Sequence, residues 1–323
     1  MKTEISTDRD AAVELLRQGE VVALPTETVY GLAADAVNPI AVAKIFEAKG
    51  RPRFDPLIVH LPDRDWLEKV ADLPTQDRQL VLKLAEKFWP GPFTMVLPKR
   101  DAVPEIVTAG LETVAVRISA HPVFAQIVET FGKPLAAPSA NRFGRISPTT
   151  ARHVLDDLGG QIPLIIDAGP ATHGIESTIV SLHDGKIDIL RRGPITSEKL
   201  SQFGIVEAVS SAARISAPGQ LPSHYAPRTP LQIVDDLESF KSDQRCALLA
   251  WNPAKKDERF VAIRHLSEKQ DLREAATNLF RDLRELDQLD VDLIIAERVP
   301  SQGLGAAILD RLSRASSGGR LLS

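Results

Sequence analysis

Short apolar runs recur along the first two thirds of the chain, separated by stretches in which apolar positions return every three or four residues. The short runs, bounded by Pro, Gly or charged residues, predict strands, and the longer amphipathic stretches predict helices. Many strands with interspersed helices indicate an α/β fold built on a large, twisted, mostly buried sheet. The predicted strands are VVALP, PLIVHL, FTMVLP, TVAVRIS, PLAAPS, PLIIDAG, STIVSL and KIDILR.

Two of the predicted helices carry clear end signals. In TDRDAAVELLRQG we expect Thr7 to be the N-cap and Gly19 to stop the helix. In NPIAVAKIFEAKG we expect Asn38 to be the cap, Pro39 the first helical residue and Gly50 the end. Both helices would flank the first strands of the sheet.

The last ninety or so residues alternate more regularly. PLQIVDD, CALLAWN, FVAIRHL and VDLIIAERV are predicted as strands, with helices expected at about 267–288 and 303–315. Such alternation predicts a small, parallel, Rossmann-like α/β domain at the C-terminus.

Prolines mark the boundary between the two parts. Of the 23 prolines, 21 lie before residue 231, and RISAPGQLPSHYAPRTP reads as an extended linker. We therefore predict a first domain over 1–209, a linker over 210–230 and a second domain over 231–323.

Composition narrows the class of protein. The 323 residues are 43% apolar, enough for a sizeable core, and a net charge of −4 excludes a bulk polyanion binder. Cys246 is the single cysteine, which excludes an internal disulfide and a Cys-rich zinc site. The polar start MKTEISTDRD and the absence of any apolar run near the ~20 residues that span a bilayer predict a soluble, cytoplasmic protein.

Cations, hydroxyls and amides collect at the ends of the predicted strands. Lys49, Arg51 and Arg53 lie close together in KGRPR, where prolines hold the backbone extended. Cations on a stiff loop suit phosphates or carboxylates. The alternative is a solvated charge run.

Arg117 interrupts an apolar strand in AVRIS and must find an anion there, which could be a ligand or a structural carboxylate. Ser139 and Ser147 flank Gly144 in APSANRFGRISPTT, where Ser147–Pro148 could instead cap a helix. Ser177 starts a strand and Arg191 ends one, so both add to the same pattern.

Several common sites are absent from the sequence. It has no GxxxxGK[ST] loop, no GxGxxG fingerprint, no GxSxG elbow and no His pair at metal spacing. In contrast, PTETVYGLAADA packs two hydroxyls, a carboxylate and a phenol beside a turn after a buried strand. The two tyrosines, Tyr30 and Tyr225, both fall in candidate stretches.

Six motifs in order resemble the YrdC-like domain of threonylcarbamoyl-adenylate synthases. The linker SAPGQLPSHYAP and the tail GLGAAILDRL are similar to the longer, two-domain form of that family. The resemblance implies a twisted mixed sheet around a basic cavity. The motifs are PTETVYGLAADA, KGRPRFDPLIVHL, WPGPFTMVLP, VAVRIS followed by HP, APSANRFGRISPT and GIESTIV.

The resemblance also implies an activity. Such an enzyme joins L-threonine, bicarbonate and ATP into L-threonylcarbamoyl-adenylate and releases pyrophosphate, with Mg²⁺ held by the triphosphate and no protein metal site. Partner proteins, the tRNA-modifying threonylcarbamoyl transferases, would pass the group to the adenosine beside the anticodon, so any tRNA contact would be weak or indirect.

Site residues carry over from the motifs. Lys49 and Arg51 would act catalytically by neutralising the triphosphate. Asp55, Phe143 and Asp310 depart from the family pattern, and Asp55 stands where Asn is expected, placing a negative charge near phosphates. The implied threonine-binding residues are Thr28, His60, Arg117, Ala137 and Ser177, and the implied ATP-binding residues are Arg51, Asp55, Thr113, Ser139, Ser147, Arg191 and Tyr225.

Two other classes of protein carry or could use such a domain, and the linker allows one further interpretation. A non-catalytic double-stranded-RNA-binding module is the alternative, although the cations are few and mixed with hydroxyls. The hydrogenase-maturation carbamoyltransferases carry a similar domain but need Cys-rich zinc fingers, which one cysteine excludes. Since SHYAP holds an aromatic framed by prolines, we interpret the linker as a lid in which Tyr225 covers the adenylate.

Overall fold

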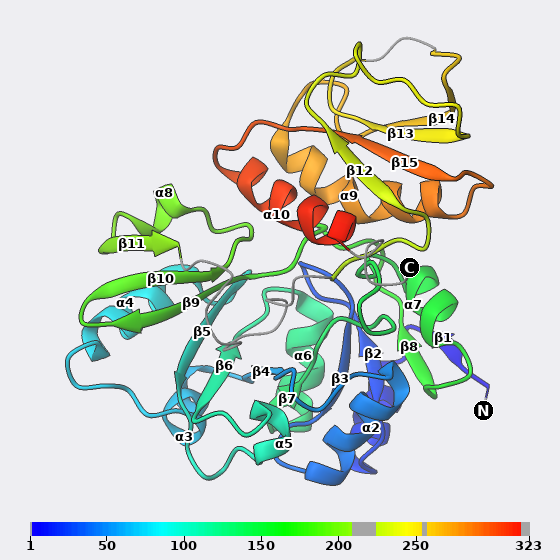
Figure 1. Ribbon diagram of the computed structural model, residues 1–323. Coiled ribbons are helices and arrows are strands. Elements are labelled where there is room, and N and C mark those ends of the chain that lie inside the picture. The colour runs from blue at the N-terminus through cyan, green and yellow to red at the C-terminus, as the bar shows by residue number, and fades with distance from the viewer. Residues whose placement is uncertain (1, 209–223, 254–256, 318–323) are drawn as a thin grey trace. The chain divides into compact units, whose positions relative to one another are not determined.

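The computed structural model describes residues 2–208, 224–253 and 257–317. Most of the predicted linker, 210–223, therefore lies outside the described residues. The chain divides into two compact units, which we describe separately (Figure 1). Unit 1 comprises residues 1–143, 148–172 and 176–220, and unit 2 comprises 144–147, 173–175 and 221–323.

Unit 1 is built on a mixed sheet, 11-stranded among the described residues, with the order β1-β8-β2-β3-β7-β4-β6-β5-β9-β10-β11. Parallel pairs such as β4–β6 and β5–β9 alternate with antiparallel pairs such as β5–β6 and β9–β10. All eight runs predicted as strands contain one. The strands are β1 (Glu4–Ser6), β2 (Val22–Leu24), β3 (Gly31–Asp35), β4 (Ile58–His60), β5 (Phe93–Pro98), β6 (Thr113–Arg117), β7 (Leu135–Ala136), β8 (Leu164–Ile166), β9 (Thr178–His183), β10 (Lys186–Arg191) and β11 (Ile205–Ala208).

Helices pack on both faces of this sheet. Side chains alternate between the faces, so Ala23 joins a core with α2, α4 and α7, while Val22 and Leu24 join a core with α1 and α6. No helix in the described part of the chain is long and apolar enough to cross a membrane. The helices of unit 1 are α1 (Arg9–Arg17), α2 (Pro39–Lys49), η1 (Arg64–Trp66), α3 (Leu67–Val70), α4 (Arg78–Phe88), α5 (Glu105–Thr108), α6 (Pro122–Phe131), α7 (Ala151–Leu158) and α8 (Ser197–Leu200).

The α2 end signals are confirmed. Asn38 caps the helix by accepting from two backbone amides, Pro39 is its first residue, and Gly50 ends it in the left-handed conformation. The Thr7 cap is wrong, because α1 is capped by Asp8, whose carboxylate accepts from the amides of residues 10 and 11. A carboxylate at this position also complements the positive end of the helix dipole.

Two further features of unit 1 differ from the sequence prediction. Ser147–Pro148 does not cap a helix, because α7 begins at Ala151 and Thr150 caps it by accepting from the amide of His153. Strands β1, β3 and β11 are not among the predicted strands, and β3 was missed because GLAADA lacks the β-branched and aromatic residues that favour strands. Strand β3 forms because it pairs with β2 and β7 on its two sides.

Unit 2 contains a four-stranded sheet in the order β12-β15-β13-β14. Every pairing in it is parallel, which confirms the predicted parallel α/β domain. Helix α10 lies close to its predicted bounds, whereas α9 begins at Leu272, later than predicted, and ends close to its predicted end. The elements are β12 (Leu231–Val234), β13 (Cys246–Ala250), β14 (Phe260–His265), α9 (Leu272–Asp287), β15 (Leu293–Glu297) and α10 (Leu304–Ser317).

Within unit 2, Gly174 allows the short segment 173–175 to pack closely against the backbone of helix α9. Gly174 has φ +69°, and a Cβ there would lie within 2.5 Å of the Ala276 carbonyl oxygen and of the Thr277 Cα. These are backbone atoms of a helix, which cannot move aside. We expect Gly174→Ala to lower the free energy of unfolding of unit 2 by about 2–4 kcal/mol, the sum of overpacking and left-handed strain.

Thermal unfolding and amide hydrogen exchange of the full chain would measure this effect, with faster exchange expected in α9 and unchanged exchange in α2. Gly303→Ala is the matched control, because Gly303 has φ +56° but nothing within 4 Å of its Cβ position. It is expected to cost only ~1 kcal/mol. Equal losses in the two variants would show that the α9 contact is unimportant.

Candidate active site

The carboxyl end of β6 holds a buried ion pair. Arg117 donates from Nη2 to Glu27 Oε1 at 2.5 Å, from Nη1 to Thr28 Oγ1 at 3.0 Å and from Nε to the Gly91 carbonyl at 3.1 Å. The relative exposure of Arg117 is 3% and that of Glu27 is 6%. The anion that Arg117 requires is thus Glu27, the carboxylate of PTETVYGLAADA, which is not among the site residues expected from the sequence.

Glu27 is ionised at neutral pH. Burial by itself would raise the pKa of its carboxyl, but the charge of Arg117 and the hydrogen bonds from Ser119 and Arg117 outweigh burial and hold that pKa at about 2. Ser119 Oγ donates to Glu27 Oε2 at 2.5 Å. The pair therefore leaves Arg117 oriented and charged, with further N–H groups to offer, because a guanidinium has five.

His60 lies beside Arg117, because β4 and β6 pair in parallel with these two residues in register. Its ring centroid is 4.8 Å from that of Phe124 in α6. Burial, and then the charge of Arg117, lower the pKa of His60 to about 3, so its ring is neutral. Within the described structure its Nδ1 is buried without a hydrogen-bond partner, and a neutral ring nitrogen of this kind accepts from a hydroxyl or amine.

Two further predicted threonine-binding residues lie on neighbouring strands. Ala137 follows β7 and donates its amide to the Ile58 carbonyl at 3.0 Å. Ser177 precedes β9, and its Oγ is 2.8 Å from Thr94 Oγ1. Arg191 donates from Nη2 to the same Ser177 oxygen at 3.0 Å. Ser177, a predicted threonine-binding residue, is therefore in contact with Arg191, a predicted ATP-binding residue.

The basic run after α2 is mostly buried. Lys49 is 3% exposed and donates to the carbonyl oxygens of Ser139 and Asn141. Burial, and then the charge of Arg51, lower the pKa of Lys49 well below its ordinary value. Arg51 is 7% exposed, whereas Arg53 is exposed. The solvated-run alternative is therefore wrong for Lys49 and Arg51 and holds only for Arg53.

Arg51 is fixed by the loop that leads into β4. It donates from Nε to the Asp55 carbonyl at 3.1 Å and from Nη2 to the Pro56 carbonyl at 2.8 Å. Its Nη2 is also 2.9 Å from Asp55 Oδ2. Thr113 is the first residue of β6. Because β4 and β6 run parallel, Thr113 lies at the same end of these strands as the loop that leads into β4.

The two remaining predicted nucleotide residues belong to unit 2. Ser147 is fully buried, and its carbonyl accepts from Arg284 of α9 at 3.4 Å. Tyr225 is 1% exposed and has φ +62°. Its ring stacks on Phe280 of α9 at 5.5 Å, and the guanidinium of Arg311 of α10 lies 5.1 Å from the ring centroid.

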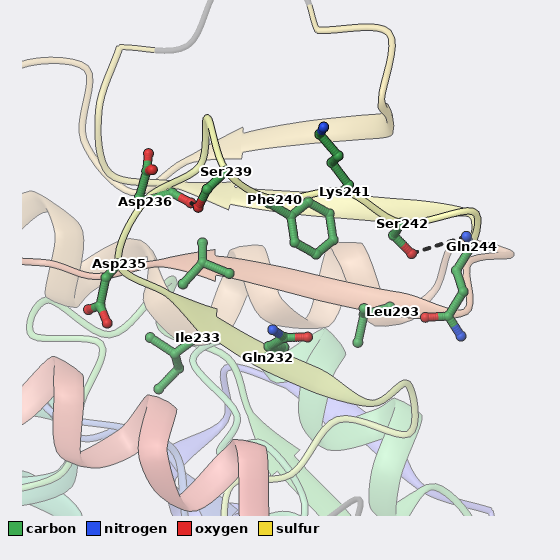
Figure 2. A pocket seen from close by; sticks show the side chains of 11 residues that line it. Gln232, Ile233, Asp235, Asp236, Ser239, Phe240, Lys241, Ser242, Gln244 and Leu293 are labelled. Carbon is green, nitrogen blue, oxygen red and sulfur yellow. Dashed lines mark hydrogen bonds between the residues drawn. The ribbon is translucent and has the colours of Figure 1, made fainter.

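A cavity of about 620 Å³ lies elsewhere in unit 2, along the edge strand β12 (Figure 2). No predicted site residue lines it. Asp235 and Asp236 face it with a single cation, Lys241, so it suits a triphosphate poorly. We therefore place the candidate site at the buried charges of unit 1, not at this cavity.

Comparison with protein families gives two matches. The Sua5/YciO/YrdC family, described as telomere recombination, matches residues 14–193, and the family described as threonylcarbamoyl-AMP synthase, C-terminal domain, matches residues 195–317. Two similar proteins are threonylcarbamoyl-AMP synthases. That of Pyrococcus abyssi is 39% identical over 94% of this chain and 93% of its own length. That of Bacillus subtilis is 41% identical over 96% of this chain and 93% of its own length.

Solved structures show the same fold over nearly the whole chain. The crystal structure of P. abyssi Sua5 complexed with L-threonine superposes with a TM-score of 0.88, at 36% identity and covering 98% of both chains. A second P. abyssi Sua5 structure, in which a consecutive histidine and tyrosine are replaced by alanine, gives a TM-score of 0.88 at 35% identity, covering 98% of this chain and 97% of that one. The expected twisted mixed sheet with a second, parallel sheet is confirmed.

Proposed function

The chain belongs to the threonylcarbamoyl-AMP synthase family, and we propose that the buried charges of unit 1 form the site at which it joins L-threonine, bicarbonate and ATP. One observation carries the assignment of the site. Arg117 and the neutral His60 end two neighbouring strands of unit 1, and the same unit holds a second buried cationic set, Lys49 at the end of α2 and Arg51 in the loop that follows. Two buried clusters of this kind suit an amino acid and a polyphosphate.

The chemistry requires positioning more than covalent participation by the protein. Bicarbonate gives CO₂ and hydroxide, and the neutral amine of threonine attacks the CO₂ carbon. A C–N bond forms as one C–O π bond opens, and the amine proton combines with the hydroxide as water, leaving a carbamate. A carbamate oxygen then attacks the α-phosphorus of ATP, and the bond to the bridging oxygen breaks to release pyrophosphate. Because a carbamate decomposes in water, a buried site favours the reaction. Holding three reactants in line contributes the rest.

In the threonine half, we assign the carboxylate to the N–H groups of Arg117 that Glu27 and Thr28 leave unused. His60 Nδ1 would accept from the threonine hydroxyl or amine, since its ring is neutral and this nitrogen is buried without a partner in the described structure. Ala137 would close the pocket wall, and Ser177 would hold the carbamate oxygens toward the nucleotide.

In the nucleotide half, Lys49 and Arg51 would neutralise the triphosphate, and Arg191 would reach the α-phosphate, because it is already bonded to Ser177. Mg²⁺ would enter with ATP and be held by its phosphates. When bound, the ion supplies further positive charge. Asp55, Thr113 and Ser139 complete the proposed ATP contacts of unit 1, while Ser147 and Tyr225 of unit 2 remain predictions from the sequence.

The product carries an activated threonylcarbamoyl group for threonylcarbamoyladenosine in tRNA, the role of this family. We propose that separate threonylcarbamoyl transferase proteins receive it in the cytoplasm. A net charge of −4 supports no extended tRNA surface on this chain, so direct tRNA contact would be weak.

The decisive experiment is mass-spectrometric detection of L-threonylcarbamoyl-AMP after the full chain is incubated with L-threonine, bicarbonate and MgATP. Product and stoichiometric pyrophosphate are expected only when all three substrates are present. ATP turnover without threonine dependence would contradict the proposal. Binding of double-stranded RNA without turnover would support the non-catalytic alternative instead.

Tyr225 provides a separate test of the domain proposal, in which 1–209 and 231–323 are joined by a lid over 210–230. The sequence contains a single His–Tyr pair, His224–Tyr225. Because the Tyr225 ring is held between Phe280 and Arg311, we interpret it as the anchor that fixes the linker. Tyr225→Ala is expected to raise the KM for ATP about tenfold or more, by releasing that anchor, with threonine affinity unchanged.

Steady-state kinetics with each substrate varied in turn would measure the difference. Tyr225→Phe is the matched control, since it keeps the ring between its two neighbours, and it is expected to behave like the wild type. An unchanged KM for ATP in the alanine variant would refute the anchor.

A further inference from the structure

Asp55 carries a negative charge where the proposed site must receive a polyanion. It is fully buried, and its side-chain oxygens accept no hydrogen bond within the described structure. In the part of the chain that the structure describes, its ion-pair partner is Arg51, whose Nη2 lies 2.9 Å from Oδ2. If Arg51 also binds the triphosphate, two anions share one guanidinium in a place from which water is excluded.

Cations face Asp55 from three directions. Lys49 comes from the end of α2, Arg51 from the following loop and Arg191 from the end of β10, and all three favour the ionised carboxylate. Burial opposes them and is the larger effect, so the pKa of Asp55 is raised above its ordinary value even before any nucleotide binds. The protonation of this carboxyl therefore depends on the balance between burial and the three cations.

ATP shifts this balance in one direction. Its phosphates bring several negative charges to the same cations, and like charges held close together in a buried site disfavour ionisation of the weaker acid. We propose that ATP binding is coupled to proton uptake by Asp55, which then holds the triphosphate as a neutral acid that donates a hydrogen bond from its protonated oxygen. The proton comes from solvent and returns to solvent when pyrophosphate and the adenylate leave.

The proposal rests on the ATP site proposed above and predicts a definite pH dependence. The proton-bound form is favoured in the complex, so ATP affinity is greatest at low pH. It falls as pH rises from the free-state pKa of Asp55 toward the pKa in the complex, by at most about tenfold per pH unit. Above both pKa values of Asp55, the ATP affinity falls no further.

Isothermal titration calorimetry of MgATP binding to the full chain, without threonine, tests this directly. Titrations at one pH in buffers of different ionisation enthalpy give the number of protons taken up. We expect uptake by the wild type, and less uptake with a flatter pH dependence in Asp55→Asn, whose amide is neutral at every pH. At high pH the variant is expected to bind ATP more tightly than the wild type.

Controls separate Asp55 from other titrating groups. The γ-phosphate contributes equally to wild type and Asp55→Asn, but Asp55 also acts on Lys49, so the share of the difference that arises through Lys49 needs a control of its own. Asp157→Asn makes the same chemical change at the other carboxylate that acts on Lys49, so it measures that share, and its effect on proton uptake is expected to be smaller than that of Asp55→Asn. Equal uptake in wild type and Asp55→Asn would overturn the proposal, and so would ATP affinity that rises with pH, as a metal-binding carboxylate would produce.

A second readout needs no variant. Infrared difference spectra of the wild type, labelled with ¹³C in its aspartate carboxyls, are expected to show a protonated-acid carbonyl band appearing with MgATP. If the wild type bound no ATP at all, the proposed function would fail. ATP binding without this band would remove only the inference about Asp55.

Discussion

Arg117→Ala is expected to weaken L-threonine binding by about 2–4 kcal/mol, roughly 30- to 1,000-fold, the scale for removing one partner of a buried charge pair. The reason lies in the geometry around the guanidinium. It is held by Glu27, Thr28 and the Gly91 carbonyl, so its remaining N–H groups point in a fixed direction before the substrate arrives. Calorimetric titration with L-threonine measures the loss, and ATP binding is expected to change little.

The same variant is also expected to lose stability, because it leaves the ionised Glu27 buried beside Ser119 without its counter-charge. A second variant separates the two effects. Arg117→Met combined with Glu27→Gln removes both charges, so it is expected to recover most of the stability and none of the threonine affinity. Near-normal threonine affinity in either variant would show that Arg117 is only a structural partner of Glu27.

Arg51→Ala is expected to reduce ATP-dependent turnover by ~10²–10³, the range for removing one group that stabilises charge in a transition state. Arg51 is pre-oriented by the carbonyls of Asp55 and Pro56, so it needs no reorganisation when charge develops at the phosphorus. Single-turnover measurements with saturating L-threonine would show the loss in the chemical step, with threonine binding preserved.

Two controls belong with this variant. Arg51→Lys is expected to rescue only part of the rate, because a point charge replaces a planar fork. Arg53→Ala removes a neighbouring, exposed arginine and is expected to behave like the wild type. Full activity of Arg51→Ala, or equal losses at positions 51 and 53, would mean that no single cation of this loop is positioned for catalysis.

Much of the candidate site could be predicted from local patterns, and what was missed has a common cause. The strand ending in Arg117, the loop holding Lys49 and Arg51 and the hydroxyl at Ser177 each stand out against an apolar run. Glu27 does not stand out as a site residue, because its partner lies 90 residues away in the chain. Only the pairing of strands brings the two together.

The sequence by itself determined most of the buried strands, the bounds of several helices and the family. Helix α2 follows from Asn38, Pro39 and Gly50, and the buried strands follow from their apolar runs, because both depend on residues a few positions apart. The order of short motifs likewise needs no contact to be read, and that order alone indicates the class of reaction.

Only the tertiary structure decided which charges are buried and what they face. Lys49 and Arg51 lie inside while Arg53 remains in solvent, although all three come from one short run. Cations from α2, a loop and β10 face Asp55, and together with burial they set the pKa of its carboxyl. The physical reason is that desolvation and pairing depend on distances between segments far apart in sequence, and these distances exist only once the sheet has formed.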